Sequence, residues 1–124
     1  MATKNATFVV NPAGDGSLEL VTWPLLATDD GAPVGPEKSQ WADRTVQVGV
    51  AGDVFNTGTV VIEGSNDGVT WNILRAPDST SLIFTTPGLK EVLEMTGYIR
   101  PRASVAVTNV SVILGMRRAL PSRT

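Results

Sequence analysis

Residues 59–71, TVVIEGSNDGVTW, carry the pattern of two antiparallel strands joined by a turn. Apolar and other side chains alternate in residues 59–64 and again in residues 69–74, as the pleat of a half-buried strand requires. Between the two runs stands an Asp-Gly pair, which favours a tight hairpin turn because glycine accepts a positive φ. The stretch therefore predicts a β-hairpin with its turn at residues 65–68, and it predicts that Trp71 packs in the core.

The same alternation recurs along the whole chain. Valine, isoleucine and threonine make up 35 of the 124 residues, and these branched side chains suit a pleated sheet. Twenty glycines and prolines leave room for one short helical candidate, at residues 89–95, and Pro101 marks an edge strand or a bulge. We predict an all-β fold, an antiparallel two-sheet sandwich of jelly-roll type with about eight strands and at most one short helix. The remaining strands are expected at residues 6–10, 17–23, 43–51, 81–86, 98–104 and 110–114.

A chain of 124 residues and 13.1 kDa can bury one hydrophobic core. We divide this single domain into an N-terminal arm with the first strands (1–40), a sandwich core (41–116) and a basic C-terminal tail (117–124). Residues 27–40 hold two glycines and two prolines, so we expect a long surface loop or arm there.

The composition is that of a folded chain, with 42% hydrophobic and 18% charged residues. No apolar run approaches the roughly 18 residues that span a bilayer. The first residues lack the apolar core of a signal peptide. We therefore expect neither a membrane partner nor export.

The chain contains no cysteine and no histidine. This removes disulfides, thiolate metal sites and every Ser-His or Cys-His catalytic pair. Glu91 and Glu94 could share a helical face, but the sequence shows no cleft for a glycosidase, so we interpret them as solvated. Asp29 and Asp30, with Asp15, lack the spacing of a calcium loop. We therefore expect no enzyme activity, no catalytic or metal-binding residue and no cofactor.

Charge is divided unevenly along the chain. Residues 1–95 carry all twelve acids against five bases, a net charge of −7, whereas residues 96–124 carry five arginines and no acid. Two interpretations are open: the basic segment pairs with acidic neighbours inside the fold, or it forms a patch that meets an acidic partner. Direct binding of nucleic acid is the weaker interpretation, because Tyr98 is the only aromatic residue near the arginines and bases need a stacking platform.

Trp23 and Trp41 are the candidates for exposed aromatic contacts. Trp23 precedes a proline, and Trp41 follows a polar loop. Indole rings are frequent anchors of protein interfaces, and sugar rings also stack on them, so a carbohydrate-binding interpretation stays open. The candidate partner-binding residues are Trp23, Trp41, Arg100, Arg102, Arg117 and Arg118.

Several segments, taken together, resemble a known family. They are DRTVQV at residues 43–48, TVVIEGSNDGVTW at 59–71, the segment 89–94 and YIRP at 98–101. Over residues 43–116, about 60% of the chain, the sequence resembles the small head decoration (cement) proteins of tailed double-stranded DNA bacteriophages. Such sequences have a glycine-rich turn before the last strand. Residues 103–109 have no glycine, so we expect a loop of different shape there.

The resemblance implies a jelly-roll-like sandwich on the outer surface of an icosahedral head, made in the host cytoplasm. Such a protein binds the major capsid protein at junctions between subunits and stabilises the shell. The resemblance also implies that the protein has no catalytic residue and no cofactor. It further implies a dimer or trimer at a capsid symmetry axis. The alternatives are a phage tail or receptor-binding β-module that binds host glycan, and a carbohydrate-binding or adhesion domain of bacterial origin.

Overall fold

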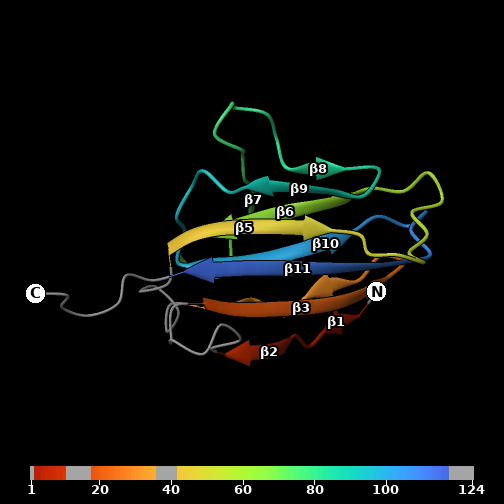
Figure 1. Cartoon of the computed structure of the whole chain (residues 1–124), viewed down its shortest axis with the longest axis horizontal. Coiled ribbons are helices and arrows are strands. Elements are labelled where there is room, and N and C mark those ends of the chain that lie inside the picture. The colour runs from red at the N-terminus through yellow and green to blue at the C-terminus, as the bar shows by residue number, and fades with distance from the viewer. Residues whose placement is uncertain (1, 11–17, 36–41, 118–124) are drawn as a thin grey trace, which may run out of the picture.

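The computed structural model of the protein describes residues 2–10, 18–35 and 42–117. These ranges contain eleven β-strands and no helix, and the strands form two sheets packed face to face (Figure 1). No helix in this part of the chain could therefore cross a membrane. The predicted all-β class and the two-sheet sandwich are confirmed.

Sheet A has the strand order β1-β4-β10-β6-β7, and β8 pairs with β6 beyond the end of β7. The pair of β10 with β6 is antiparallel and runs from Tyr98 opposite Ser65 to Ala103 opposite Val60. β1 pairs with β4 in parallel. The strands are β1 (Thr3–Lys4), β4 (Asp30–Gly31), β6 (Val60–Ser65), β7 (Asn72–Ile73), β8 (Ile83–Phe84) and β10 (Tyr98–Ala103).

Sheet B has the order β2-β3-β11-β5-β9, and each of its pairs is antiparallel. Its central strand β11 pairs with β3 along its whole length, from Asn109 opposite Leu26 to Arg117 opposite Leu18. The strands are β2 (Thr7–Val10), β3 (Leu18–Leu26), β5 (Ala42–Val48), β9 (Gly88–Glu91) and β11 (Asn109–Arg117).

Eight of these strands follow the predicted jelly-roll connection. Sheet B contains the order β3-β11-β5-β9 and sheet A the order β4-β10-β6-β8. The chain crosses between the sheets at each step from β3 to β6 and again from β8 to β11, which is the double Greek key of a jelly roll. β1 and β2 add one further strand to each sheet.

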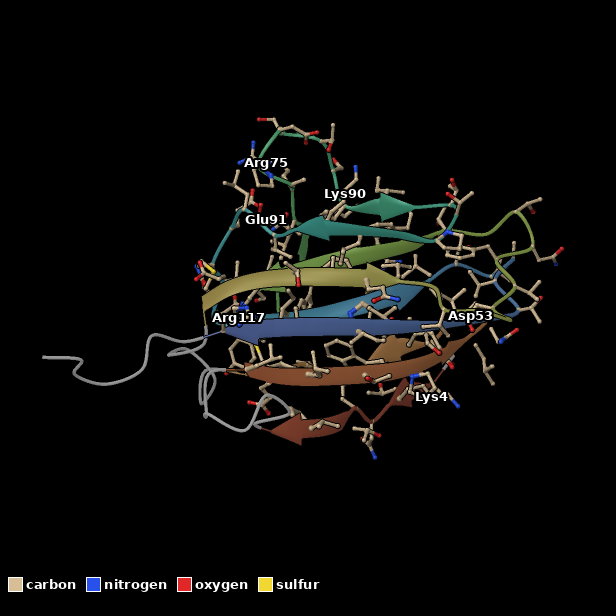
Figure 2. The ribbon with its side chains drawn as sticks, in the orientation of Figure 1. Lys4, Asp53, Arg75, Lys90, Glu91 and Arg117 are labelled. Carbon is tan, nitrogen blue, oxygen red and sulfur yellow. The ribbon has the colours of Figure 1, made fainter. Side chains whose placement is uncertain are left out.

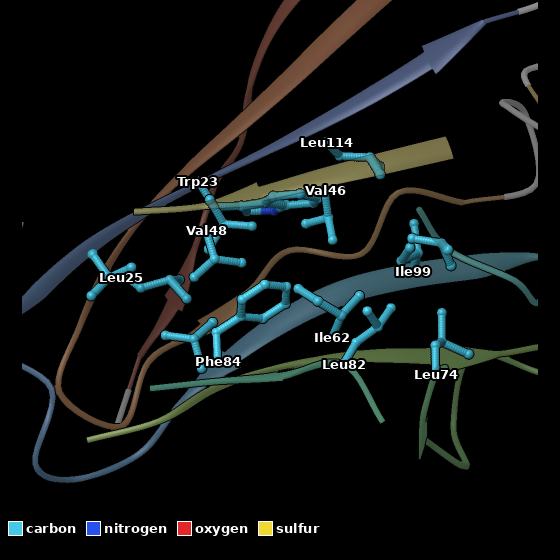
Figure 3. Packing of buried hydrophobic residues seen from close by; sticks show 14 of the residues in the cluster. Trp23, Leu25, Val46, Val48, Ile62, Leu74, Leu82, Phe84, Ile99 and Leu114 are labelled. Atoms are coloured by element: carbon cyan, nitrogen blue, oxygen red, sulfur yellow. The ribbon is translucent and has the colours of Figure 1, made fainter. Parts of the chain in front are cut away.

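The core lies between the inward-facing rows of the two sheets. In β3, the buried residues Val21, Trp23 and Leu25 alternate with neighbours that are partly or fully exposed. This period of two is the signature of a strand with one face in the core. Figure 3 shows these rows meeting, with Trp23, Val46, Val48 and Leu114 from sheet B and Ile62, Leu82, Phe84 and Ile99 from the opposite side.

The helix predicted at residues 89–95 is wrong. β9 occupies the start of this segment and pairs with β5, from Gly88 opposite Val48 to Glu91 opposite Thr45. An isolated helix of two turns is marginal, because nucleation costs more than so few hydrogen bonds return. Pairing with β5 instead gives the segment a ladder of backbone hydrogen bonds.

Residues 27–35 are part of the sandwich, so the surface loop predicted there is wrong; residues 36–40 lie outside the described ranges. β4 belongs to this segment, and Val34 after it is buried. The backbone of Val34 exchanges two hydrogen bonds with Ile99 of β10, at 2.9 and 3.1 Å. The glycines and prolines that indicated a loop have packing roles instead.

Pro101 shows one such role. It lies in β10 between β4 and β6, in continuous register with β6, and so neither in an edge strand nor at a bulge, the two alternatives predicted. The flanking N–H groups of Ile99 and Ala103 donate to Val34 and Asp29, so the nitrogen of Pro101 faces the same side. On the side of β10 that faces β4, the ring of Pro101 therefore stands where another residue would have its N–H group. Gly31 leaves space for this ring, because a Cβ on Gly31 would touch it.

Candidate protein-binding surface

The outer face of sheet A carries a network of charged side chains. The pairing of β6 with β10 places Glu63 opposite Arg100, with Arg102 two residues further on the same face. Oε1 of Glu63 accepts a hydrogen bond from Nε of Arg100 at 3.1 Å, and Oε2 accepts one from Nε of Arg102 at 3.1 Å. Glu63 is only 5% exposed, so these two arginines take the place of water as partners of its carboxylate.

Arg100 is held by two further groups. Its guanidinium lies over the ring of Trp71, 4.1 Å from the centroid, and its Nη1 lies 3.7 Å from Oδ2 of Asp30. This stacking is a cation–π contact. Arg100 therefore has partners on three strands or loops of its own chain.

The described arginines of the basic segment differ in whether they have acidic partners within the chain. Arg100 and Arg102 both pair with acidic neighbours inside the fold, as the first interpretation held. Arg117 is exposed at the end of β11, and Arg118 lies outside the described residues. Among the described arginines of that segment, Arg117 is the best placed to meet a partner.

The tryptophans are placed differently from the sequence prediction. Trp23 is 1% exposed, and its indole N–H donates to the carbonyl of Ala32 at 2.9 Å, so it cannot anchor a partner. Trp71 was predicted in the core but is half-buried beside Arg100. The reason is the length of the β6–β7 connection, which shifts Trp71 out of the strand. Trp41 lies outside the described residues.

The turn after β6 accounts for the length of the β6–β7 connection. Asp67 was predicted to sit in a tight turn, and its Oδ1 accepts hydrogen bonds from the N–H groups of Val69 and Thr70, both at 2.8 Å. The hydroxyl of Ser65 also donates to it. The hydrogen bonds from Thr70, Val69 and Ser65 lower the pKa of Asp67 from 3.8 to about 2. Oδ1 of Asp67 is therefore used to fold the loop.

A polar hollow of about 480 Å³ opens beside this turn. Glu94 lines it, but its carboxylate accepts hydrogen bonds from the backbone N–H of Arg75 at 2.7 Å and from Nε of Arg75 at 2.6 Å. Desolvation raises the pKa of Glu94, and these hydrogen bonds outweigh it, so the net shift is downward. Glu91, the second predicted carboxylate, is exposed on β9. Within the described ranges, no group of three or more acidic side chains could hold a metal ion.

The outer face of sheet B differs from that of sheet A because its centre is uncharged. One row of paired residues crosses all five strands without a charged side chain. The residues of this row are Thr7, Thr22, Ile113, Gln47 and Leu89.

Apolar side chains extend this face on both sides of the row. Leu18, Leu20, Pro24 and Leu26 point outward from β3, in alternation with its buried residues. The charged side chains lie at the margins: Figure 2 shows Glu91 and Arg117 toward the same end of the sheet. We call this surface, from β2 to β9, the uncharged face.

The uncharged face was not predicted from the sequence. A signal was present, because residues 18, 20, 22, 24 and 26 contain no charge, and neither do residues 109, 111, 113 and 115. These positions alternate with the residues that the structure buries in β3 and β11. They become one surface only when β3 and β11 are known to be neighbours, and that pairing joins residues about 90 positions apart.

Comparison with known proteins gives structural matches only. No family model matches the sequence, and no curated protein matches it. The structure is similar to that of YomS, a protein derived from the SPBc2 prophage, with a TM-score of 0.60 and 7% identity. The match covers 80% of this chain and 93% of YomS. At this identity, the likeness establishes a shared fold.

Two further structures align over most of the chain. Peruvianin-I, a cysteine peptidase from Thevetia peruviana latex, has a TM-score of 0.48 and 14% identity over 95% of this chain and 63% of its own. A cupin 2 conserved barrel domain protein from Salinispora arenicola has a TM-score of 0.48 and 9% identity over 92% of this chain and 75% of its own. TM-scores of 0.48 are too low to bear on function.

Proposed function

We propose that the protein is a bacteriophage head decoration protein that binds the outer surface of the capsid at junctions between major capsid subunits. In this role it acts by shape and contact area, as a non-enzymatic clamp without a cofactor. The proposal is supported by the segments that resemble decoration proteins and by the jelly-roll sandwich. The fold shared with a prophage-derived protein agrees with a phage origin.

The observation that carries the proposal is the contrast between the two outer faces. On sheet A, the described charges are engaged with one another, as Glu63 is with Arg100 and Arg102. On sheet B, the centre offers apolar and threonine side chains without a charge to desolvate. Burying charges without partners is costly, whereas burying apolar area is favourable. A large flat partner such as a capsid surface would therefore dock on the uncharged face, with Arg117 at its margin.

The test mixes the purified protein with expanded empty heads of the encoding phage and measures binding by sedimentation. We expect saturable binding and heads that resist heat better. Ile113→Lys places a charge at the centre of the uncharged face, and we expect it to reduce head affinity about 100-fold or more. Ile83→Lys, on the exposed outer side of β8, is the matched control and should bind as the parent does.

A folded protein that shows no saturable binding to heads would refute the proposal. Equal loss of binding in Ile113→Lys and Ile83→Lys would remove the uncharged face from it. Arg100→Ala and Arg102→Ala test the electrostatic alternative, and we expect both to keep binding because these arginines are already paired within the chain.

The polar hollow favours one second candidate, a receptor-binding module for host glycan. Its lining includes Asn66, Asp67, Thr70 and Asn72, which offer the amide, carboxylate and hydroxyl groups that bind sugar hydroxyls. Trp71 is in the same loop, so sugar binding should change its fluorescence. Titration with host surface glycans that leaves the tryptophan emission unchanged would remove this candidate.

A further inference from the structure

A small hollow lies on the uncharged face, at the end of the sheet where β3 finishes and β11 begins. We call it the β3–β11 hollow. Its volume is about 210 Å³, and the outward-facing residues Pro24, Leu26, Asn109 and Ser111 are part of its lining. The strand register places Asn109 beside Leu26 and Ser111 beside Pro24, so the four side chains form two adjacent rows. Because both rows stand on a paired ladder, the shape of the hollow is fixed by the sheet.

Apolar side chains stand on both sides of Asn109. Leu26 is 50% exposed, and Val54 is 46% exposed. The backbone of Val54 exchanges two hydrogen bonds with that of Asn109, at 2.8 and 3.1 Å. Residues opposite each other in an antiparallel pair point to the same face, so Val54 also points outward. Burial of these apolar walls against a partner would therefore be favourable.

The β3–β11 hollow also offers hydrogen-bonding groups to a ligand. Within the described ranges, Asn109 and Ser111 form hydrogen bonds through their backbone atoms only, which leaves the side-chain amide and the hydroxyl available. Among the described residues of the lining, only Lys4 is charged, and its side chain is 34% exposed. Its Nζ lies 3.7 Å from Oδ2 of Asp29, too far for a hydrogen bond. The ammonium group therefore keeps its donors for a ligand.

The size of the hollow indicates what it can hold. Pockets for small-molecule ligands measure about 300–1,000 Å³, so a volume of about 210 Å³ suits one side chain of a partner rather than a cofactor. We propose that the β3–β11 hollow binds a single apolar side chain of about the size of leucine, and that a carboxylate next to this side chain in the partner pairs with Lys4. Side chains that fill such pockets carry much of the energy of an interface.

The inference deepens the proposed function and rests on it for the identity of the partner as a capsid protein. It adds the chemistry that the partner must present: an apolar side chain and an acidic group side by side. Figure 2 shows Lys4 at the end of the sandwich opposite to Arg117, so the two cations mark opposite margins of the uncharged face.

The first test needs no capsid and uses N-acetyl-leucine, which carries both groups that the hollow would recognise. An NMR titration should give saturable shifts of the backbone amides of Leu26 and Ser111, with a dissociation constant of about 1–10 mM. N-acetylglycine, which lacks the apolar side chain, should bind more weakly by about tenfold or more. N-acetyl-leucine amide, which lacks the carboxylate, should bind about two- to fivefold more weakly, as expected for a partly exposed ion pair.

Four variants connect this binding to the hollow. Ser111→Phe fills it with a ring and should abolish the shifts, and Leu26→Ser removes one apolar wall and should weaken binding about fivefold or more. Gln47→Phe adds the same ring at an exposed position of β5 outside the hollow, so this control should keep the shifts of the parent. In Lys4→Gln, the acid and the amide of the probe should bind alike.

Circular dichroism checks that each variant is folded. An absence of saturable shifts when N-acetyl-leucine is added to the parent would overturn the inference. Equal binding by the parent and by folded Ser111→Phe and Leu26→Ser would do the same.

The second test separates the inference from the proposed function. In sedimentation with heads, Ser111→Phe should lower the affinity at least about tenfold, and Lys4→Gln should lower it less and reduce its dependence on salt. Ile83→Phe, on the exposed side of β8, is the control and should bind as the parent does. Equal head binding by the parent and Ser111→Phe would overturn the inference and leave the proposed function standing.

Heads that do not bind the parent would overturn the proposed function instead. The titration with N-acetyl-leucine would then decide alone whether the hollow binds an apolar side chain next to a carboxylate.

Discussion

Nε of Arg100 donates to Oε1 of Glu63 at 3.1 Å, between two residues that the strand register already places opposite each other. Backbone pairing and charge pairing thus agree at the centre of sheet A. Agreement between backbone pairing and side-chain pairing is typical of sequences that specify one structure. It also explains why a strongly basic segment does not produce a free basic patch on this face.

Glu63→Gln should destabilise the protein by about 2–3 kcal/mol, because it leaves two arginines without their carboxylate in a partly buried site. Arg102 is about half exposed, which keeps the loss below that of a fully buried pair. The free energy of unfolding from urea titration measures the change. Arg102→Ala is the control and should cost no more than about 1 kcal/mol. Equal losses in the two variants would contradict the central role of Glu63.

Gly31→Ala should destabilise the sandwich by about 1–3 kcal/mol or more, because the added Cβ would touch the ring of Pro101 and lie 2.7 Å from Cδ1 of Trp23. Neither ring can move without disturbing the core. Gly97→Ala is the matched control, since the nearest heavy atoms to its Cβ would be 3.8 Å away. We expect the control to stay within about 0.5 kcal/mol of the parent. A neutral Gly31→Ala would show that β4 is not held against β10.

Stability should fall with pH in acid, partly because of Asp67. Its folded pKa of about 2 lies below the ordinary 3.8, so the charged form is favoured by folding. The contribution is fully present above pH 3.8 and is lost as the pH falls through about 2. Asp67→Asn should show a smaller change in denaturation midpoint between pH 4 and pH 2 than the parent. An identical pH dependence in both proteins would show that the loop hydrogen bonds are not retained in solution.

Local sequence patterns predicted most of the strands, because the alternation of apolar residues in a strand can be read from neighbouring positions alone. The alternation in β5 and β11 is set by which residues face the core, and the sequence shows it directly. The segment 89–95 failed because Leu89, Val92 and Leu93 also fit a helical spacing. Pairing with β5, about 45 residues earlier, decides in favour of the strand, and a local pattern cannot show that pairing.

The candidate site was harder to predict, because it depends on register. The sequence shows that acids and arginines are segregated, but only the pairing of β6 with β10 brings Glu63 to Arg100. The exposure of Trp23 was mispredicted for a related reason. Its following proline indicated an irregular surface, whereas Pro24 points outward from β3 and Trp23 points inward. Parity along the strand was a better guide than the neighbouring residue type.

The segment Thr3–Val10 belongs to both layers, since β1 pairs with β4 in sheet A and β2 pairs with β3 in sheet B. A mechanical load on this segment would therefore have to break two ladders in separate sheets before the remaining strands could part. A cargo protein fused before residue 3 would be attached through a segment that is paired in both sheets. We expect a fusion of this kind to keep its cargo attached under shear.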